Sequence, residues 1–235
     1  SFPVIVPLGA NTDEPIGMRF RLSTLGVNGP NGAANDGEVE DYLAPVTPVY
    51  DFGDNPLTYG TVLADDGPRH QIVPGIYLGA TVDPDADGQP TSGADGDDVN
   101  PVNVDDEDGV VFLDPLIPGQ SARVQVTAST NGFLNAWVDF DGSGGFDFPV
   151  DRIVANQIVL TGVNVITFTV PATATPGDTY SRFRFTTASE GGGEPTGLAP
   201  DGEVEDHVVS IIEVDLGDLP TAAQSGFGTS YPTTF

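Results

Sequence analysis

The side chains of this sequence whose types and spacing suggest chemistry are carboxylates. Ten of them fall within residues 83–108, at Asp83, Asp85, Asp87, Asp95, Asp97, Asp98, Asp105, Asp106, Glu107 and Asp108. The run begins Asp-Pro-Asp-Ala-Asp-Gly, so alternate carboxylates can converge on one cation while Gly88 allows a sharp turn. Because so many like charges repel one another, they need counterions. The run therefore predicts a calcium loop, although no acid closes it at the spacing of an EF-hand.

A second group of oxygen ligands follows an expected strand at residues 135–139. Asp139, Asp141 and Ser143 keep the same alternate spacing, and Asp147 lies four residues further on. A cation bound there would fix the corner between the strand and its loop. Ligands that offer only hard oxygen atoms point to calcium rather than to zinc or copper.

A third group is the segment Asp-Gly-Glu-Val-Glu-Asp, which occurs twice. The two copies supply the acids Asp36, Glu38, Glu40 and Asp41, and Asp201, Glu203, Glu205 and Asp206. In a strand, Glu203 and Glu205 would share one face, whereas Val204 would point to the other. We predict that these acids bind calcium, together with Asp51 and Asp54 of another repeated motif.

A solvated surface is the plainer explanation of the same acids. The chain carries 35 acidic residues against seven arginines, which gives a net charge of −28. Salt-adapted proteins stay hydrated with such compositions, and a run of charges is usually a solvated face. Solvation requires neither the Asp-x-Asp-x-Asp-Gly order nor a particular glycine, so this order favours calcium for the first two groups.

The absence of lysine and cysteine from all 235 residues excludes whole classes of chemistry. Without lysine the chain forms no P-loop, Schiff base or isopeptide bond, and without cysteine it forms no disulfide, thiolate zinc site or thiol nucleophile. A net charge of −28 also opposes nucleic-acid binding, because phosphates are bound by clustered cations. No apolar run reaches the roughly 18 residues that a membrane-spanning helix needs.

Short strands separated by turns must position these acids. Hydrophobic residues make up 38% of the chain, and 30 glycines and 21 prolines punctuate short runs rich in valine and phenylalanine. Alternation of apolar and polar residues predicts strands at residues 123–127, 135–139, 165–170, 181–186 and 207–211. The sequence thus predicts an all-β fold, an antiparallel β-sandwich of the jelly-roll or immunoglobulin type, with long acidic calcium-binding loops.

Three motifs recur in the same order at a nearly constant offset. Residues 36–41 recur at 201–206, Arg19-Phe20-Arg21 at Arg182-Phe183-Arg184, and Asp51-Phe52-Gly53-Asp54 at Asp215-Leu216-Gly217-Asp218. We therefore predict a tandem array, in which residues 1–47 are the C-terminal part of one module, 48–213 a complete module and 214–235 the start of the next. Either the chain is a stretch of a longer polypeptide, or a neighbouring chain completes its end strands, as in β-augmentation.

Catalysis is not expected, because few residues suit it. Tyr42 replaces His207 in the other copy of its motif, and we expect His70, beside Arg69, to make a structural hydrogen bond or ion pair. A glycosidase-like pair of carboxylates is chemically feasible, but crowded acids would disturb one another's titration unless a metal were bound. We expect Trp137 to belong to the core.

The repeated Asp-Gly-Glu-Val-Glu-Asp segment resembles the GEVED domain, a module of large secreted and cell-surface bacterial proteins. Further stretches that resemble the family's pattern, in order, are residues 51–54, 68–70, 78–79, 83–89, 96–98, 105–110, 134–141 and 182–184. The resemblance covers nearly all of the chain and implies an extracellular location, secreted or at the cell surface. It implies no particular reaction, because the family is described by location and architecture.

We therefore expect a non-enzymatic, calcium-binding structural or adhesive repeat module of a bacterial surface protein or filament, assembled head to tail by strand complementation. Its partners would be neighbouring modules or identical chains, with a glycan or another cell-surface ligand in addition, but neither nucleic acid nor a membrane interior. The alternative is a calcium-dependent carbohydrate-binding sandwich, in which exposed Tyr50, Tyr59 or Tyr77 would stack on a sugar.

Overall fold

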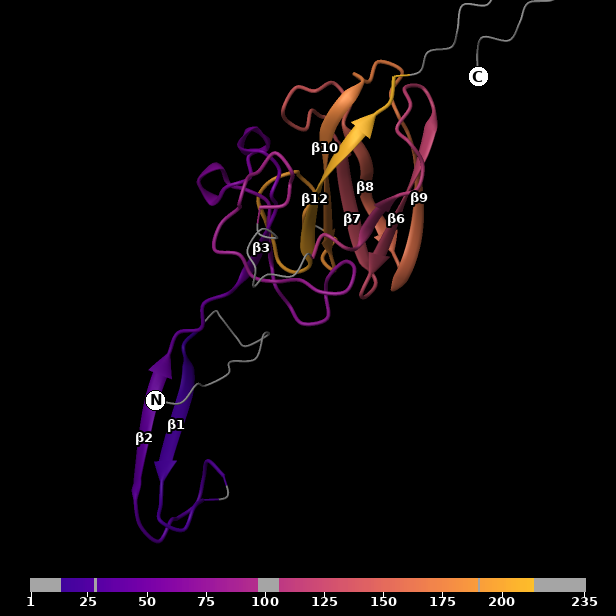
Figure 1. Cartoon of the computed structure of the whole chain (residues 1–235). Helices are drawn as coiled ribbons and strands as arrows, with labels where there is room; N and C mark the ends of the chain where they lie inside the picture. Colours follow the sequence, from indigo (N-terminus) through magenta and orange to yellow (C-terminus); the bar gives the residue numbers. More distant parts are fainter. Residues whose placement is uncertain (1–13, 28, 97–105, 190, 214–235) are drawn as a thin grey trace, which may run out of the picture.

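The structure, a computed structural model, describes residues 14–27, 29–96, 106–189 and 191–213 (Figure 1). Four strands form the larger sheet, in the order β12 (Glu203–Ile211), β10 (Gly177–Thr186), β7 (Gly132–Val138) and β8 (Arg152–Val159). A second sheet has the order β5 (Val110–Phe112), β6 (Ser121–Ala128) and β9 (Gly162–Thr169). Neighbouring strands in both sheets run antiparallel. The expected all-β, antiparallel architecture is confirmed.

One apolar core lies between these two sheets, as in a β-sandwich. Strand β6 alternates buried with more exposed residues, and Val124 and Val126 on its inner face are fully buried. Phe183 and Phe185 of β10 belong to the same buried cluster. The Phe112 and Phe183 rings lie 5.9 Å apart in an edge-to-face contact that joins the two sheets. Burial of each such phenylalanine stabilises the fold by about 1.5–3 kcal/mol.

A small third sheet and two short turns of 3-10 helix cover the other face of β10 and β12. This sheet has the order β11 (Leu198–Ala199), β4 (Arg69–Gln71) and β3 (Tyr50–Phe52), and the helical turns are η1 (Leu57–Tyr59) and η2 (Leu63–Asp65). Strand β12 contacts both β3 and β4. Because β10 and β12 are covered on both faces, five charged residues of these strands are buried: Arg182, Arg184, Glu203, Glu205 and Asp206.

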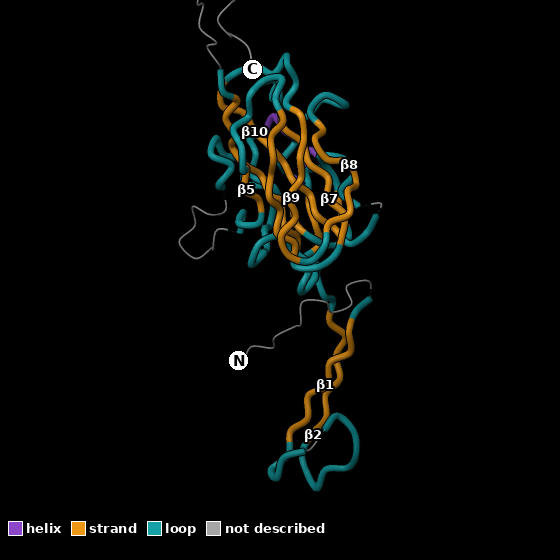
Figure 2. The backbone as a smooth tube through the Cα atoms, turned by 90° about the vertical axis from the view of Figure 1, so that its right-hand side faces the viewer, coloured by secondary structure: helices purple, strands orange, loops and turns teal. Residues whose placement is uncertain are grey.

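A separate hairpin of β1 (Ile16–Leu22) and β2 (Glu38–Ala44) projects from the body (Figures 1 and 2). In this hairpin Arg19 stands opposite Asp41. In the body Arg182 stands opposite Asp206 in the same way, and the other pairs of β10 and β12 follow the same register. The sequence repeat is therefore also a repeat of this hairpin geometry.

The Asp-Gly step of the repeated motif makes the turn that leads into β12. Oδ1 of Asp201 accepts the N–H of Thr187 at 2.7 Å, and Asp36 makes the matching bond in the projecting hairpin at 3.0 Å. Gly202 follows with a φ of +94°. A Cβ at this position would lie 1.8 Å from the carbonyl oxygen of Phe185. Only glycine fits, which explains this part of the motif.

The five strands expected from alternation are confirmed, as β6, β7, β9, β10 and β12. Strand β8 was not expected, because register shifts against β7 and a positive φ of 45° at Asn156 break its alternation. Within the acidic stretch, described residues 83–96 and 106–108 form no strand and only an isolated bridge at Asp85, as expected for a loop. None of the described residues form a helix long and apolar enough to cross a membrane. The module boundaries stay predictions, and residues 214–235 lie outside the described residues.

Candidate metal-binding site

Strand β12 divides the acids of the Glu-Val-Glu-Asp segment between two faces. Glu203 and Glu205 stand opposite Phe185 and Phe183 of β10, and directly opposed residues in a sheet share a face. The two glutamates therefore point toward the interior of the sandwich, whereas Asp206 points toward the small sheet. The expected division of this segment is confirmed.

Glu203 and Glu205 are buried at the edge of the sandwich, with exposed fractions of 1% and 0%. Oε2 of Glu203 accepts the N–H of Leu78, and Oε1 of Glu205 accepts the N–H of Gly109 at 2.9 Å. Oε2 of Glu205 lies 3.2 Å from Nε2 of His207. Oε1 of Glu203 has no hydrogen-bond partner. A buried carboxylate oxygen in this state needs either a cation or a proton.

The charges that act on Glu203 are negative. Burial raises the pKa of Glu203 well above its usual value, and the charges of Glu205, Asp51 and Asp106 raise it further. Asp51 lies on β3 and Asp106 lies just before β5, and both are buried. Oδ2 of Asp51 accepts the N–H of Val204 at 2.6 Å. Glu203 is thus exposed to the charges of acids on β3, on β12 and in the acidic loop, although among the described residues no three acids that include Glu203 lie within 4.8 Å of one another.

On the opposite face of β10 and β12, Arg182 and Asp206 form a fully buried ion pair. The guanidinium donates from Nε to Oδ1 and from Nη2 to Oδ2, both at 2.7 Å. The N–H of Asn55 donates to the same Oδ2 at 2.8 Å. Such two-pronged pairs are the strongest charge-assisted hydrogen bonds. Asp206, one of the predicted calcium ligands, is held here by an arginine.

Arg184 binds backbone carbonyl oxygens instead of an acid. Its Nη1 donates to Glu194 at 2.7 Å and to Thr196 at 2.6 Å, and its Nη2 donates to Gly197 at 2.7 Å. Burial and the neighbouring Arg182 lower the pKa of Arg184 to about 9, which leaves the guanidinium charged at neutral pH. The two repeated arginines therefore tie β10 to the segments that cover it.

His70 links the small sheet to this arginine. Its Nε2 accepts from Nε of Arg184 at 3.0 Å, so its Nδ1 carries the proton and donates to the carbonyl oxygen of Asp201 at 2.7 Å. Burial and the positive charge of Arg184 lower the pKa of His70 well below its usual value. The imidazole is neutral, and the expected structural hydrogen bond is confirmed.

Acidification is expected to destabilise the protein through His70. In the unfolded chain the imidazole has a pKa of about 6.5, whereas in the folded protein its pKa is lowered. The stability is therefore fully present above about pH 6.5 and falls toward about pH 5, by up to about 1.4 kcal/mol per pH unit. Urea unfolding across this range measures the slope. His70→Gln should unfold with a smaller slope, and equal slopes for both proteins would contradict this role.

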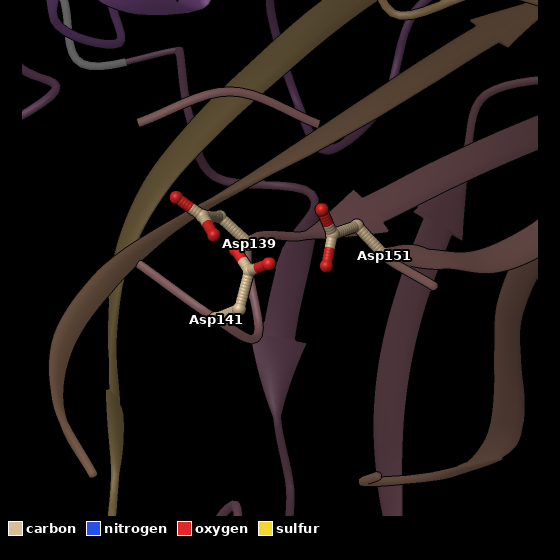
Figure 3. Close-up of side chains that lie close together, drawn as sticks. All are labelled: Asp139, Asp141 and Asp151. Carbon is tan, nitrogen blue, oxygen red and sulfur yellow. The ribbon is translucent and has the colours of Figure 1, made fainter. Parts of the chain in front are cut away.

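The loop after β7 gathers a second group of acids. Ligand oxygens of Asp139, Asp141 and Asp151 all lie within 4.8 Å of one another (Figure 3). Asp139 and Asp151 are buried, and Asp141 is exposed. Burial and the charges of Asp139 and Asp141 raise the pKa of Asp151. Asp151 was not among the predicted ligands, although an acid twelve residues after Asp139 stands one position beyond the closing acid of an EF-hand loop.

Hydrogen-bond donors already fill the acceptor positions of Asp139. Its Oδ1 accepts the N–H groups of Gly142 and Ser143 at 2.8 and 3.1 Å. Its Oδ2 accepts the N–H of Gly144 at 2.9 Å and the hydroxyl of Tyr59 at 2.7 Å. A carboxylate offers about four lone-pair sites, and these four donors occupy them. Asp139 therefore holds the loop together through hydrogen bonds.

Asp141 and Asp151 keep room for a cation. The N–H of Phe140 donates to Oδ1 of Asp151 and that of Asp147 to Oδ2, so each oxygen accepts one backbone bond. Oδ1 of Asp141 accepts the N–H of Ser143. The predicted ligands Ser143 and Asp147 thus enter this loop through their backbone N–H groups. Asp141 and Asp151 are the acids that could face an ion here.

The acidic loop distributes its carboxylates over several backbone amides. Asp85 accepts the N–H of Phe52 at 3.1 Å, and Asp87 accepts the N–H of Leu63 at 2.6 Å. Further N–H bonds go from Ala80 to Asp108, from Gln89 to Asp54 and from Asp83 to Asp106, and Glu107 is half-buried. Among the described residues, the Asp-x-Asp-x-Asp run does not bring three acids within 4.8 Å. Asp97, Asp98 and Asp105 lie outside the described residues.

The other predicted ligands lie apart from the Glu203 site. Asp36 and Asp201 accept turn donors, and Asp41 accepts the guanidinium of Arg19. Glu38 and Glu40 are exposed on the projecting hairpin.

Two aromatic side chains have defined surroundings. Trp137 is buried as expected, with the guanidinium of Arg152 5.6 Å from its ring centroid. The expectation that Tyr59 is exposed is wrong: the ring is buried against Phe146 and Tyr180, because η1 packs onto β10 and the hydroxyl reaches Asp139. Tyr59 therefore cannot stack on a sugar.

Comparison with known families gives a match over part of the chain. Residues 133–210 match the GEVED domain family model. This range runs from β7 to β12 and includes the Asp139 loop, both arginines of β10 and Glu203. Searches of curated proteins and of solved structures gave no match. The resemblance to the GEVED domain family is thus confirmed over residues 133–210.

Proposed function

We propose that this chain is a non-enzymatic, calcium-binding structural module of an extracellular bacterial surface protein or filament. The observation that carries the proposal is the carboxylate of Glu203, which is buried with a bare Oε1 among the charges of Glu205, Asp51 and Asp106. Calcium would balance these charges and fill the empty acceptor position. The ion would join β3, β12 and the acidic loop where other extracellular domains use disulfides.

The chemistry of the donors supports calcium over other ions. All acids that act on Glu203 offer hard oxygen atoms, and the chain has no cysteine. Calcium accepts six to eight oxygens in flexible arrangements, whereas magnesium demands an octahedron and zinc prefers nitrogen or sulfur. Extracellular modules of this kind bind calcium with dissociation constants of about 10⁻⁴ to 10⁻³ M.

The Asp139 loop is the second place where we propose calcium. Asp141 and Asp151 converge there and keep acceptor positions that the protein's own donors do not fill. An ion at this corner would fix the start of β8 against the end of β7. Binding at this loop is separable from the Glu203 site by the variant Asp141→Asn.

Equilibrium dialysis with calcium tests the Glu203 site through a control that the chain itself supplies. Glu203→Gln should bind one calcium ion fewer per chain, because it removes the buried charge. Glu38→Gln changes the same motif position on the projecting hairpin, where Glu38 is exposed, and should bind calcium as the wild type does. Equal binding by wild type and Glu203→Gln would refute the site.

A further inference from the structure

The projecting hairpin exposes the side chains that its copy in the body buries. The side chains of Arg19 and Asp41 are 42% and 57% exposed, whereas the matching ion pair of β10 and β12 is 0% exposed. Val39 is 51% exposed, whereas Val204 at the same motif position is 2% exposed. The two hairpins have the same register, so the difference lies in what covers them.

In the body, residues 50–56 cover this face. Oδ2 of Asp51 accepts the N–H of Val204, and the N–H of Asn55 donates to Oδ2 of Asp206. Between these two contacts, a Cβ on Gly53 would lie 2.5 Å from the same Oδ2. The cover thus requires a carboxylate, a residue without a side chain and a backbone N–H at fixed spacing.

The same three features recur at residues 214–220. Their sequence, Val-Asp-Leu-Gly-Asp-Leu-Pro, repeats the Tyr-Asp-Phe-Gly-Asp-Asn-Pro of residues 50–56 at an offset of 164. Asp215 corresponds to Asp51 and Gly217 to Gly53. The third contact uses only a backbone N–H, which Leu219 also has.

We propose that the hairpin face formed by Val39 and Asp41 binds residues 214–220 of a second copy of this chain. In this complex the carboxylate of Asp215 accepts the N–H of Val39, and the N–H of Leu219 donates to Asp41. Strand β12 ends at the end of the body opposite the hairpin (Figure 1), so the contact joins copies head to tail. Contacts of this type build open filaments when the rotation between copies does not close, and rings when it does.

Docking deepens the proposed structural role, because it gives the module its partner, but it does not require calcium. None of its contacts involves Glu203 or the Asp139 loop. Association is therefore expected in calcium and in EDTA alike, and a failure of the calcium proposal leaves this test intact.

Sedimentation velocity of the 235-residue chain over a concentration series tests the docking. The wild type should associate as its concentration rises. Gly217→Val should require at least about tenfold higher concentration for the same association, because a side chain there meets the carboxylate of Asp41. The control Gly226→Val changes the same tail outside residues 214–220 and should associate as the wild type does.

Two results would overturn the proposal. The first is that the wild type stays monomeric, or that it associates and the substitution Gly217→Val does not weaken the association. The second is protection of the Val39 amide from hydrogen exchange that does not depend on concentration, because the tail would then bind its own hairpin. Protection that rises with concentration, and that Gly217→Val removes, supports docking between copies.

Discussion

Replacing Arg182 by methionine is expected to lower the melting temperature by about 6–20 °C. The substitution leaves the carboxylate of Asp206 buried, with the N–H of Asn55 as a remaining donor. Breaking a buried ion pair by removing one partner costs about 3–5 kcal/mol. For a domain of about 150–250 residues, each kcal/mol shifts the melting temperature by about 2–4 °C. Thermal unfolding followed by circular dichroism measures the change.

The projecting hairpin provides the matched control. Arg19→Met breaks the same two-pronged pair at the same register position, but there both partners are largely exposed to water. The melting temperature of the body should stay unchanged. The double variant Arg182→Met with Asp206→Leu should recover most of the loss, because it buries no unpaired charge. Equal effects of Arg182→Met and Arg19→Met would contradict the role assigned to burial.

The fold was predictable where apolar and polar residues alternate over one continuous strand. Strands β6 and β10 follow this rule, and the sequence alone located both. Strand β8 could not be found in this way, because its positive φ at Asn156 and its register shifts belong to the pairing with β7. Likewise, the cover over β10 consists of short strands whose pattern is too brief to be informative.

For the candidate metal sites, the sequence predicts which residue types take part, but it does not predict most of their contacts. Alternation alone assigns Glu203 and Glu205 to one face of a strand. The partner of Asp206 could not be assigned, because the pairing of Arg182 depends on the register between two strands. In the same way, Asp151 joins Asp139 because β8 returns beside β7. Such contacts between distant segments are set by the assembled sheet.

Calcium is expected to raise the melting temperature by about 5–10 °C when it replaces EDTA. A ligand present at about one hundred times its dissociation constant stabilises the folded state by about 2.7 kcal/mol. Each kcal/mol again corresponds to about 2–4 °C. The reason lies in Glu203, whose buried carboxylate lacks a partner on one oxygen and is surrounded by acidic charge.

Two comparisons distinguish site-bound calcium from general salt effects. Sodium chloride at matched ionic strength should not reproduce most of the rise in melting temperature, because screening acts on exposed charges and not on a buried carboxylate. A salt-adapted protein would instead respond to any salt at molar concentration. Glu38→Gln should keep the wild-type shift, since it alters the exposed copy of the motif.

The difference in melting temperature between calcium and EDTA, measured in wild type and in Glu203→Gln, tests the central claim most directly. Calcium should raise the melting temperature of the wild type by several degrees, and Glu203→Gln should lose a large part of that rise. When both proteins are measured in EDTA, Glu203→Gln should melt at a higher temperature than the wild type. The same melting temperature of the wild type in calcium and in EDTA would contradict a calcium-stabilised module.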